Sequence, residues 1–335
     1  MFKELKSPYI IAEVAESHYG DLNRAFEMID ASSKAGASAV KFQHHIPEAE
    51  MLRNSPSSSN MREPLYDFLS RTALTIDQHL QLRQHCDQKN IDYLCTPFSL
   101  VAANELEHVV KPVAYKIGSG ELTDLPTLLE IAKFGKPMIV STGMSEVSEI
   151  TETYDALKKV VVELALTNCT SAYPPQIGDI NLGFIPVMKS IYPEAVIGHS
   201  DHSPSIYTSL GAVALGAMII EKHVTIDPQL EGPDQEVSIT FNELADLVQG
   251  AHLIHQSLSS EKQLLKSEKE IQQWARRSLV YTGNFPAGHV LQAQDIWGKR
   301  PGTGIPSKEY WNYIGKTLKT EVTFNTLASR EDFQE

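Results

Sequence analysis

The chain has 335 residues and a formal net charge of −13, because 42 acidic residues outnumber 29 Lys and Arg residues. An acidic surface repels nucleic acid and anionic membranes, so we expect neither as a partner. Three cysteines without CxxC spacing indicate reduced thiols rather than a disulfide framework. The N-terminal apolar run is too short for a signal peptide, and no stretch approaches the ~20 apolar residues of a membrane span. We therefore expect a cytoplasmic protein.

Short apolar runs alternate with helical segments along the first 250 residues. Eight runs are predicted to be strands: Tyr9–Val14, Ser38–Gln43, Asp92–Thr96, Val113–Gly118, Pro137–Thr142, Glu163–Thr170, Ala195–Ser200 and Ala217–His223. Near-continuous apolar strands joined by helices indicate a parallel sheet, and eight such units favour a closed (β/α)8 TIM barrel. No GxGxxG sequence follows any of these strands, which weakens the case for a dinucleotide-binding fold.

The segments between the strands carry helical periodicity and helix boundary signals. The first helix is predicted to begin after Asp21, a favourable N-cap residue, and to end at Gly36. Further helices are expected within Thr75–Lys89, Thr123–Phe134, Ser145–Lys158 and Ile185–Ile191. One turn-rich loop, Asn54–Asn60, follows the second strand and is either a lid over the barrel mouth or an ordinary surface loop.

The pattern changes after the barrel. We expect the catalytic barrel at residues 1–250, a connecting segment at 251–275 with polar-faced helices, and a small β-rich domain at 276–335. The last region contains short strand-like pieces separated by Pro and Gly turns, as in NFPAGHV and KRPGTGIP.

Polar residues stand at or just after the ends of all eight predicted strands. They include Glu13, Lys41, Gln43, Thr96, Lys116, Ser119, Glu121, Ser141, Ser171, Tyr173, Ser200, His202, Glu221 and His223. One such residue is readily explained as a cap or a satisfied core group. Eight strand ends of this kind are difficult to attribute to packing, and the C-terminal strand ends are where barrel enzymes build their active sites.

Two kinds of chemistry can be separated among these residues. Lys41 and Lys116, with nearby serines and glycines, suit a small ligand that carries phosphate and carboxylate groups. The alternative is that both lysines form structural salt bridges.

The histidines His202 and His223 follow neighbouring strands, and two imidazoles with open positions suit a catalytic metal site. Carboxylates of Asp201, Glu221 and Asp234 are candidates to orient them. A lone buried histidine, by contrast, is usually structural.

A family resemblance rests on many of these residues in order. AEVAESHYGDLNRA, VKFQ, CTPFS, YKIGSGE, STGM, CTSAYP, SDHS, EKHVTID and EGPD resemble the motifs of the sialic acid synthase (NeuB-like) family. The tail, RRSLVYTGNFPAGHVL followed by KRPGTGIP, resembles the antifreeze-like (SAF) domain that ends those enzymes. Ser17 and Ser171 depart from the asparagines usual at those positions, both of which border the sugar pocket.

The resemblance implies an enzyme that condenses phosphoenolpyruvate with an N-acyl amino-sugar aldehyde, by C–O cleavage and release of phosphate. The acceptor would be N-acetylmannosamine, its 6-phosphate or a 2,4-diacetamido-2,4,6-trideoxyhexose, and CTSAYP favours the pseudaminic-type branch. Carried over onto this sequence, phosphoenolpyruvate would bind Lys41, Thr96, Lys116, Ser119, Ser141 and Ser200, with Glu13, Glu121 and Glu221 as catalytic residues. The sugar would contact Gln43, Ser171, Tyr173, Asp234 and Arg300.

The resemblance also implies a metal and an assembly. His202 and His223 would hold a divalent ion, Mn²⁺ first and Mg²⁺ or Co²⁺ as alternatives, acting as a Lewis acid on the aldehyde oxygen. Arg300 would reach the sugar from the antifreeze-like domain of a partner subunit in a domain-swapped homodimer, unless it is only a surface turn residue.

Three other functions remain compatible with the residues. Another phosphoenolpyruvate-condensing barrel would need a second phosphate site, for which the sequence shows no surplus arginine cluster. A Schiff-base aldolase would use Lys116 as its nucleophile. A catalytically inactive sugar-binding homologue would explain Ser17 and Ser171, although the intact lysines and histidines argue against it.

Overall fold

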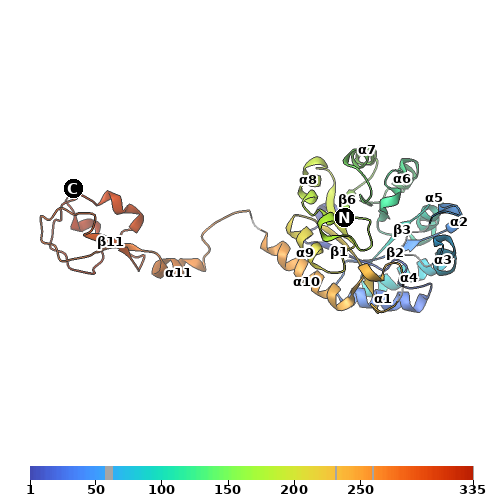
Figure 1. Ribbon diagram of the computed structural model, residues 1–335, viewed down its shortest axis with the longest axis horizontal. Coiled ribbons are helices and arrows are strands. Elements are labelled where there is room, and N and C mark those ends of the chain that lie inside the picture. The colour runs from blue at the N-terminus through green and yellow to red at the C-terminus, as the bar shows by residue number, and fades with distance from the viewer. Residues whose placement is uncertain (57–62, 231, 259, 335) are drawn as a thin grey trace. The chain divides into compact units, whose positions relative to one another are not determined.

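The computed structural model describes residues 1–56, 63–230, 232–258 and 260–334. The chain divides into two compact units, Met1–Leu258 and Ser259–Glu335, which are described separately (Figure 1). Most of the predicted lid loop, residues 57–60, lies outside the described residues. Within the described residues, no helix is both long and apolar enough to cross a membrane.

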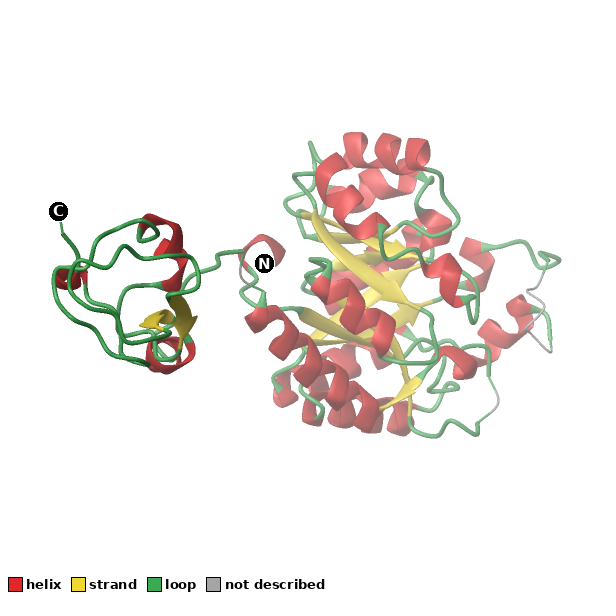
Figure 2. Cartoon of the chain, turned by 60° about the vertical axis from the view of Figure 1, so that its left-hand side comes forward, coloured by secondary structure: helices red, strands yellow, loops and turns green. Residues whose placement is uncertain are grey.

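Eight parallel strands form a closed sheet in the first unit, surrounded by helices (Figure 2). The strands are β1 (Tyr9–Glu13), β2 (Ala39–His44), β3 (Asp92–Pro97), β4 (Tyr115–Ile117), β5 (Met138–Ser141), β6 (Leu164–Cys169), β7 (Val196–Asp201) and β8 (Ile219–Thr225). Each strand pairs with the next, and β1 pairs with β8 with Ile11 opposite Glu221, which closes the barrel. The predicted (β/α)8 barrel is confirmed. A short strand, β9 (Ile239–Thr240), extends the pairing of β8.

The α-helices of this unit begin in several cases at a residue whose side chain caps the helix. They are α1 (Leu22–Lys34), α2 (Pro47–Glu50), α3 (Leu65–Thr72), α4 (Ile76–Lys89), α5 (Leu100–Glu105), α6 (Leu125–Ala132), α7 (Val147–Leu157), α8 (Phe184–Ile191), α9 (Tyr207–Ala214) and α10 (Phe241–Ser257). The Asp21 carboxylate accepts hydrogen bonds from the first backbone N–H groups of α1, as predicted. Gly36 follows the end of α1 with φ +84°, a conformation that glycine adopts without strain.

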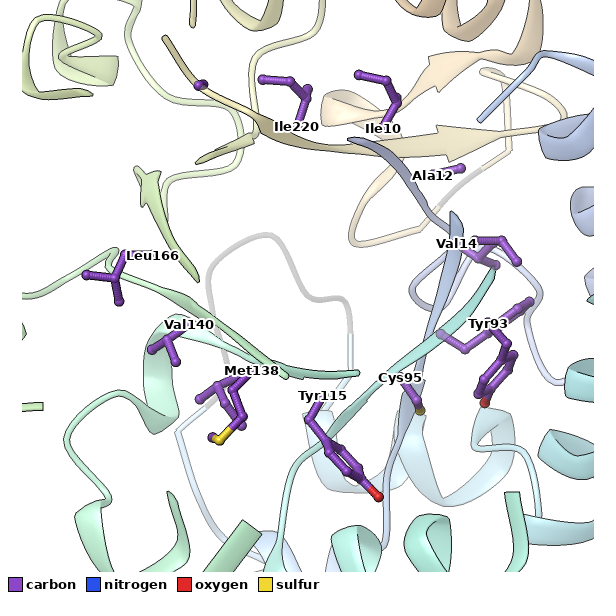
Figure 3. Packing of buried hydrophobic residues seen from close by; sticks show 14 of the residues in the cluster. Ile10, Ala12, Val14, Tyr93, Cys95, Tyr115, Met138, Val140, Leu166 and Ile220 are labelled. Atoms are coloured by element: carbon purple, nitrogen blue, oxygen red, sulfur yellow. The ribbon is translucent and has the colours of Figure 1, made fainter. Parts of the chain in front are cut away.

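Successive side chains along each strand point alternately to the outer face of the sheet, which is apolar, and into the barrel interior, which has two layers. Side chains such as Ile10, Tyr93, Tyr115 and Ile220 point away from the barrel interior and pack in the cluster between the sheet and the helices (Figure 3). Their strand neighbours face inward. Ile11, Ala39, Leu94, Ala114, Ile139 and Ile219 form an inner apolar cluster with Phe2 and Tyr9. The residues two positions further along the same strands are Glu13, Lys41, Thr96, Lys116, Ser141 and Glu221. A strand period of two therefore places a polar layer directly above an apolar plug.

The second unit has its own small core. It contains α11 (Glu268–Ala275) and the antiparallel pair β10 (Ser278–Tyr281) and β11 (Ile296–Lys299), in which Val280 lies opposite Trp297. Leu279, Tyr281, Leu291, Ile296 and Leu318 are buried together, which gives this unit a hydrophobic core independent of the barrel.

Candidate active site

A cavity of about 580 Å³ opens among the C-terminal ends of the barrel strands. Every predicted site residue except Asp201 and Arg300 lines it, so residues from all eight strands or the loops after them meet in one space. Arg300 belongs to the second unit, where its Nε donates to the carbonyl oxygen of Ala275 and its guanidinium lies over the Trp274 ring.

Two lysines and two glutamates form a buried charge network in the cavity. Lys41 and Lys116 are each only 3% exposed. The Lys41 ammonium lies 2.7 Å from Glu13 Oε2 and donates to Thr96 Oγ1 at 2.9 Å. Lys116 Nζ donates to both carboxylate oxygens of Glu221, at 2.7 and 2.9 Å. Lys41 is also 3.8 Å from Glu221 Oε2, so the two pairs form one network. Buried ions of this kind persist only because each has a close partner of opposite charge.

The two glutamates of this network have opposite pKa shifts. Burial, reinforced by the nearby charge of Glu221, raises the pKa of Glu13 despite its contact with Lys41. Burial also opposes ionisation of Glu221, but Lys116 and Lys41 outweigh it and lower the pKa of Glu221 to about 2. Glu221 is therefore the permanent anion of the network, and Glu13 is the carboxyl group better suited to hold a proton.

Two glycines allow the serine-rich loops to approach one another. A Cβ atom at Gly118 would collide with the Glu121 carboxylate, and one at Gly143 would collide with the hydroxyls of Ser171 and Ser119. Because Gly143 has no Cβ atom, its N–H can approach Ser119 and donates to Ser119 Oγ at 3.1 Å. Backbone and hydroxyl groups thus crowd together near Lys116, as expected for a site that binds a small oxyanion.

Two histidines lie close together at the ends of β7 and β8. The rings of His202 and His223 have centroids 5.3 Å apart. His202 Nδ1 is 2.8 Å from the Thr170 carbonyl oxygen and therefore carries its proton there, which leaves Nε2 as an acceptor 3.1 Å from the Tyr173 hydroxyl. His223 Nδ1 is buried and without a hydrogen-bond partner.

This arrangement fits a divalent metal with two protein ligands. An available imidazole nitrogen on each ring is the donor set that such ions take, with further positions left for water or substrate. Within the described residues, no group of three or more His, Cys, Asp or Glu side chains is arranged to hold an ion. The two histidines would thus form an open site rather than a closed structural one.

A third histidine orients the amide of Gln43. His45 Nε2 lies 2.9 Å from Gln43 Oε1, and its Nδ1 lies 3.0 Å from Glu50 Oε1. Gln43 Nε2 in turn donates to Glu13 Oε1 at 2.8 Å. Both nitrogens of His45 face acceptors, so the ring is an imidazolium. Burial opposes that charge, but the hydrogen bond to Glu50 and the nearby Glu16 and Glu121 carboxylates raise the pKa of His45.

A sequence-family model named NeuB family matches residues 28–263 of the chain. The chain belongs to the NeuB family. An N,N'-diacetyllegionaminic acid synthase of Campylobacter jejuni is 33% identical, over 93% of this chain and 96% of that protein. The human N-acetylneuraminate-9-phosphate synthase is 31% identical, over 94% of this chain and 89% of that protein.

A solved structure shows the same relationship. The N-acetylneuraminic acid (sialic acid) synthetase of Leptospira borgpetersenii serovar Hardjo-bovis, in complex with citrate, is 36% identical to this NeuB-family chain. The two superpose with a TM-score of 0.73, over 79% of this chain and 90% of that one.

One interpretation of the sequence was wrong in this NeuB-family chain. Asp201 does not orient the histidines, because it faces the outside of the barrel. Its carboxylate accepts hydrogen bonds from Thr208 and Ser209 and lies 3.5 Å from Lys222. Successive strand residues face opposite sides, so Asp201 and His202 cannot both point into the cavity.

Several cavity residues were missed from the sequence, among them Glu16, Glu50 and Cys169. Strand alternation was a usable signal for Cys169, since it continues the inward-facing series of Thr167. Glu16 lies beyond the end of β1, where alternation no longer applies.

The His45–Glu50 pair predicts a pH-dependent stability difference. Because the folded pKa of His45 lies above its unfolded value of about 6.5, the pairing stabilises fully below that pH and is lost as pH rises through the folded pKa. Glu50→Gln removes the main partner and should lower the free energy of unfolding by roughly 1–3 kcal/mol near pH 6, with a smaller loss near pH 9. Urea unfolding of both proteins across that range measures it.

The matched control is Glu48→Gln, an exposed glutamate on the same helix α2. It should leave stability within about 0.5 kcal/mol of the parent protein at every pH. A Glu50→Gln effect that does not change with pH would contradict the assignment of a charged His45.

Proposed function

We propose that the chain condenses phosphoenolpyruvate with an N-acyl amino-sugar aldehyde to give a nonulosonic acid of the sialic type and inorganic phosphate. Carbon 3 of phosphoenolpyruvate forms a bond to the aldehyde carbon, whose oxygen takes a proton. Water adds to carbon 2, and phosphate leaves with the bridging oxygen. The single observation that carries the proposal is a cavity lined by two buried ammonium groups and two adjacent imidazoles, in a chain of the NeuB family.

Lys41 and Lys116 are the groups that would bind the phosphate and carboxylate of phosphoenolpyruvate, with Ser119, Ser141, Thr96 and Ser200 as hydroxyl donors. Both lysines are paired with glutamates in this structure, as their structural interpretation requires. That pairing is compatible with binding, because the paired oxygens belong to residues that line an open cavity. Each ammonium has three N–H donors, so it can contact an anionic ligand while it keeps its glutamate partner.

The glutamates of the cavity are assigned different roles in proton transfer. Glu221 remains ionised and holds Lys116 in place, while Ser200 Oγ donates to Glu221 Oε1 at 2.9 Å. Glu13, with its raised pKa, is the residue we assign to deprotonate the water that adds to carbon 2. Gln43 fixes the orientation of Glu13 through the hydrogen bond to Oε1. Glu121, whose pKa is raised by burial, lines the same cavity and is the second proton carrier.

We assign a divalent ion, Mn²⁺ first, to His202 and His223. When bound, it would supply Lewis-acid stabilisation of negative charge on the aldehyde oxygen. The neighbouring Tyr173 hydroxyl, 3.1 Å from His202 Nε2, is a donor placed for the same oxygen or for a sugar hydroxyl.

The acceptor would occupy the part of the cavity nearest Gln43, Ser171, Tyr173 and Asp234. Arg300 would contact its N-acyl group from the second unit of a partner subunit in a domain-swapped homodimer, with that unit acting as an antifreeze-like domain. We place the enzyme in the cytoplasm, where phosphoenolpyruvate is available.

The direct test is mass spectrometry of products from phosphoenolpyruvate, Mn²⁺ and a panel of acceptors. The panel contains N-acetylmannosamine, its 6-phosphate and 2,4-diacetamido-2,4,6-trideoxyhexoses. We expect a nonulosonic acid from at least one member, with one phosphate released per product. Covalent trapping of pyruvate on Lys116 by borohydride, without phosphate release, would instead indicate a Schiff-base aldolase.

Metal binding by the two histidines is tested by equilibrium dialysis against Mn²⁺ followed by elemental analysis. His202→Ala should weaken Mn²⁺ binding at least about 100-fold and abolish condensation, because a two-imidazole site cannot hold the ion with one ligand. His108→Ala, at an exposed histidine on the barrel surface, is the matched control and should bind Mn²⁺ like the parent protein. Equal Mn²⁺ content in His202→Ala and the parent would exclude this site.

A further inference from the structure

Glu16 is a buried carboxylate that the proposed mechanism does not use. It follows β1, lines the cavity and is only 4% exposed. Neither of its carboxylate oxygens accepts a hydrogen bond from the described part of the chain. A buried anion without a donor costs several kcal/mol relative to one in water, so its retention calls for a partner from outside the chain.

The backbone around Glu16 is fixed, so the carboxylate is held in the cavity. Its carbonyl oxygen accepts a hydrogen bond from the Tyr19 N–H at 2.9 Å, and its backbone hydrogen-bonds the carboxylate of Asp234. Ala15, immediately before it, has φ +46°, a left-handed conformation that turns the chain at the end of β1. A carboxylate on such a loop is positioned before any ligand arrives.

The only cationic group recorded beside Glu16 within the described chain is already engaged. His45 Nε2 lies 3.8 Å from Glu16 Oε1, but that nitrogen hydrogen-bonds Gln43 Oε1 and the other bonds Glu50. Neighbouring carboxyl groups also act on one another at this point of the cavity. Burial and the charges of Glu13 and Glu16 raise the pKa of Asp234 to about 7.

We infer that Glu16 is a specificity-determining residue that accepts hydrogen bonds from N–H or O–H groups of the acceptor sugar and selects an unphosphorylated acceptor. This inference rests on the proposed function. Phosphoenolpyruvate cannot be the missing partner, because its fully ionised form presents oxygens that only accept hydrogen bonds. An amino-sugar carries hydroxyl and amide N–H donors, which match two unpartnered carboxylate oxygens.

The charges around the cavity oppose a phosphorylated acceptor. Six carboxyl groups line it: Glu13, Glu16, Glu50, Glu121, Glu221 and Asp234. Its lysines are Lys41 and Lys116, and no arginine lines it among the residues described. Both lysines are assigned to phosphoenolpyruvate, and both nitrogens of the His45 ring already face Glu50 and Gln43, so a sugar phosphate near Glu16 would be repelled.

The test is steady-state kinetics of Glu16→Gln, with phosphoenolpyruvate saturating and each acceptor varied. The parent protein should favour N-acetylmannosamine over its 6-phosphate by at least about tenfold in kcat/KM. In Glu16→Gln, kcat/KM for the preferred unphosphorylated acceptor should fall roughly 10- to 100-fold while the KM for phosphoenolpyruvate is unchanged. The ratio of kcat/KM for N-acetylmannosamine to kcat/KM for its 6-phosphate should decrease in Glu16→Gln, because the carboxylate that repels the phosphate has been removed. Glu48→Gln is the control of equal charge change at an exposed site.

A thermal unfolding measurement separates recognition from a structural role. Glu16 makes no side-chain hydrogen bond in the described chain, so Glu16→Gln should unfold at the parent temperature or above it. Four results would each overturn the inference. The first is a kcat/KM for the acceptor that does not change in Glu16→Gln, and the second is an equal loss of kcat/KM for phosphoenolpyruvate. The others are a preference of the parent protein for the 6-phosphate and a lowered unfolding temperature that accounts for the loss of activity. A parent protein inactive with every acceptor would instead refute the proposed function.

Discussion

The structure depends on four buried charges at the centre of a closed barrel. Lys41 and Lys116 have little access to water, and each lies against a glutamate, Glu13 or Glu221. Removing either glutamate would leave a buried ammonium short of a partner of opposite charge. The two ion pairs therefore keep two lysine ammonium groups in the cavity of an otherwise acidic protein, where an anionic substrate can bind them.

The barrel explains why this network forms at all. Inward-facing residues come every second position, so the apolar plug around Ile11 and Ile219 and the charged layer of Glu13 and Glu221 are successive layers of the same strands. Closure of the barrel brings residues more than 100 positions apart, such as Lys116 and Glu221, to 2.7 Å across its interior. The plug excludes water from below and lowers the local dielectric, which strengthens each charge interaction above it.

The same rule sets how much could be predicted from the sequence. Apolar runs and caps were sufficient to place all eight strands, because buried parallel strands are continuous in hydrophobicity. Alternation would also have assigned Asp201 to the outside and His45 to the inside. The location of Glu16 in the cavity could not be predicted from the sequence. Ala15, just before it, adopts a positive φ, which is uncommon for alanine and has no sequence signal. The contact between Lys116 and Glu221 depends on barrel closure, which the sequence spacing of the two residues does not indicate, whereas Lys41 lies opposite Glu13 on a neighbouring strand.

The most direct test of the account is phosphoenolpyruvate binding by titration calorimetry to three proteins: the parent, Glu221→Gln and the double variant Lys116→Met with Glu221→Gln. The double variant removes both charges together, so no buried unpaired ion remains to unfold the barrel. Glu221→Gln should bind phosphoenolpyruvate at least as tightly as the parent, because it removes a negative charge from the cavity and leaves the Lys116 ammonium for the ligand. The double variant should bind it about 10- to 100-fold more weakly. Equal affinity of the double variant and Glu221→Gln would show that Lys116 is a structural cation, and the account would be wrong.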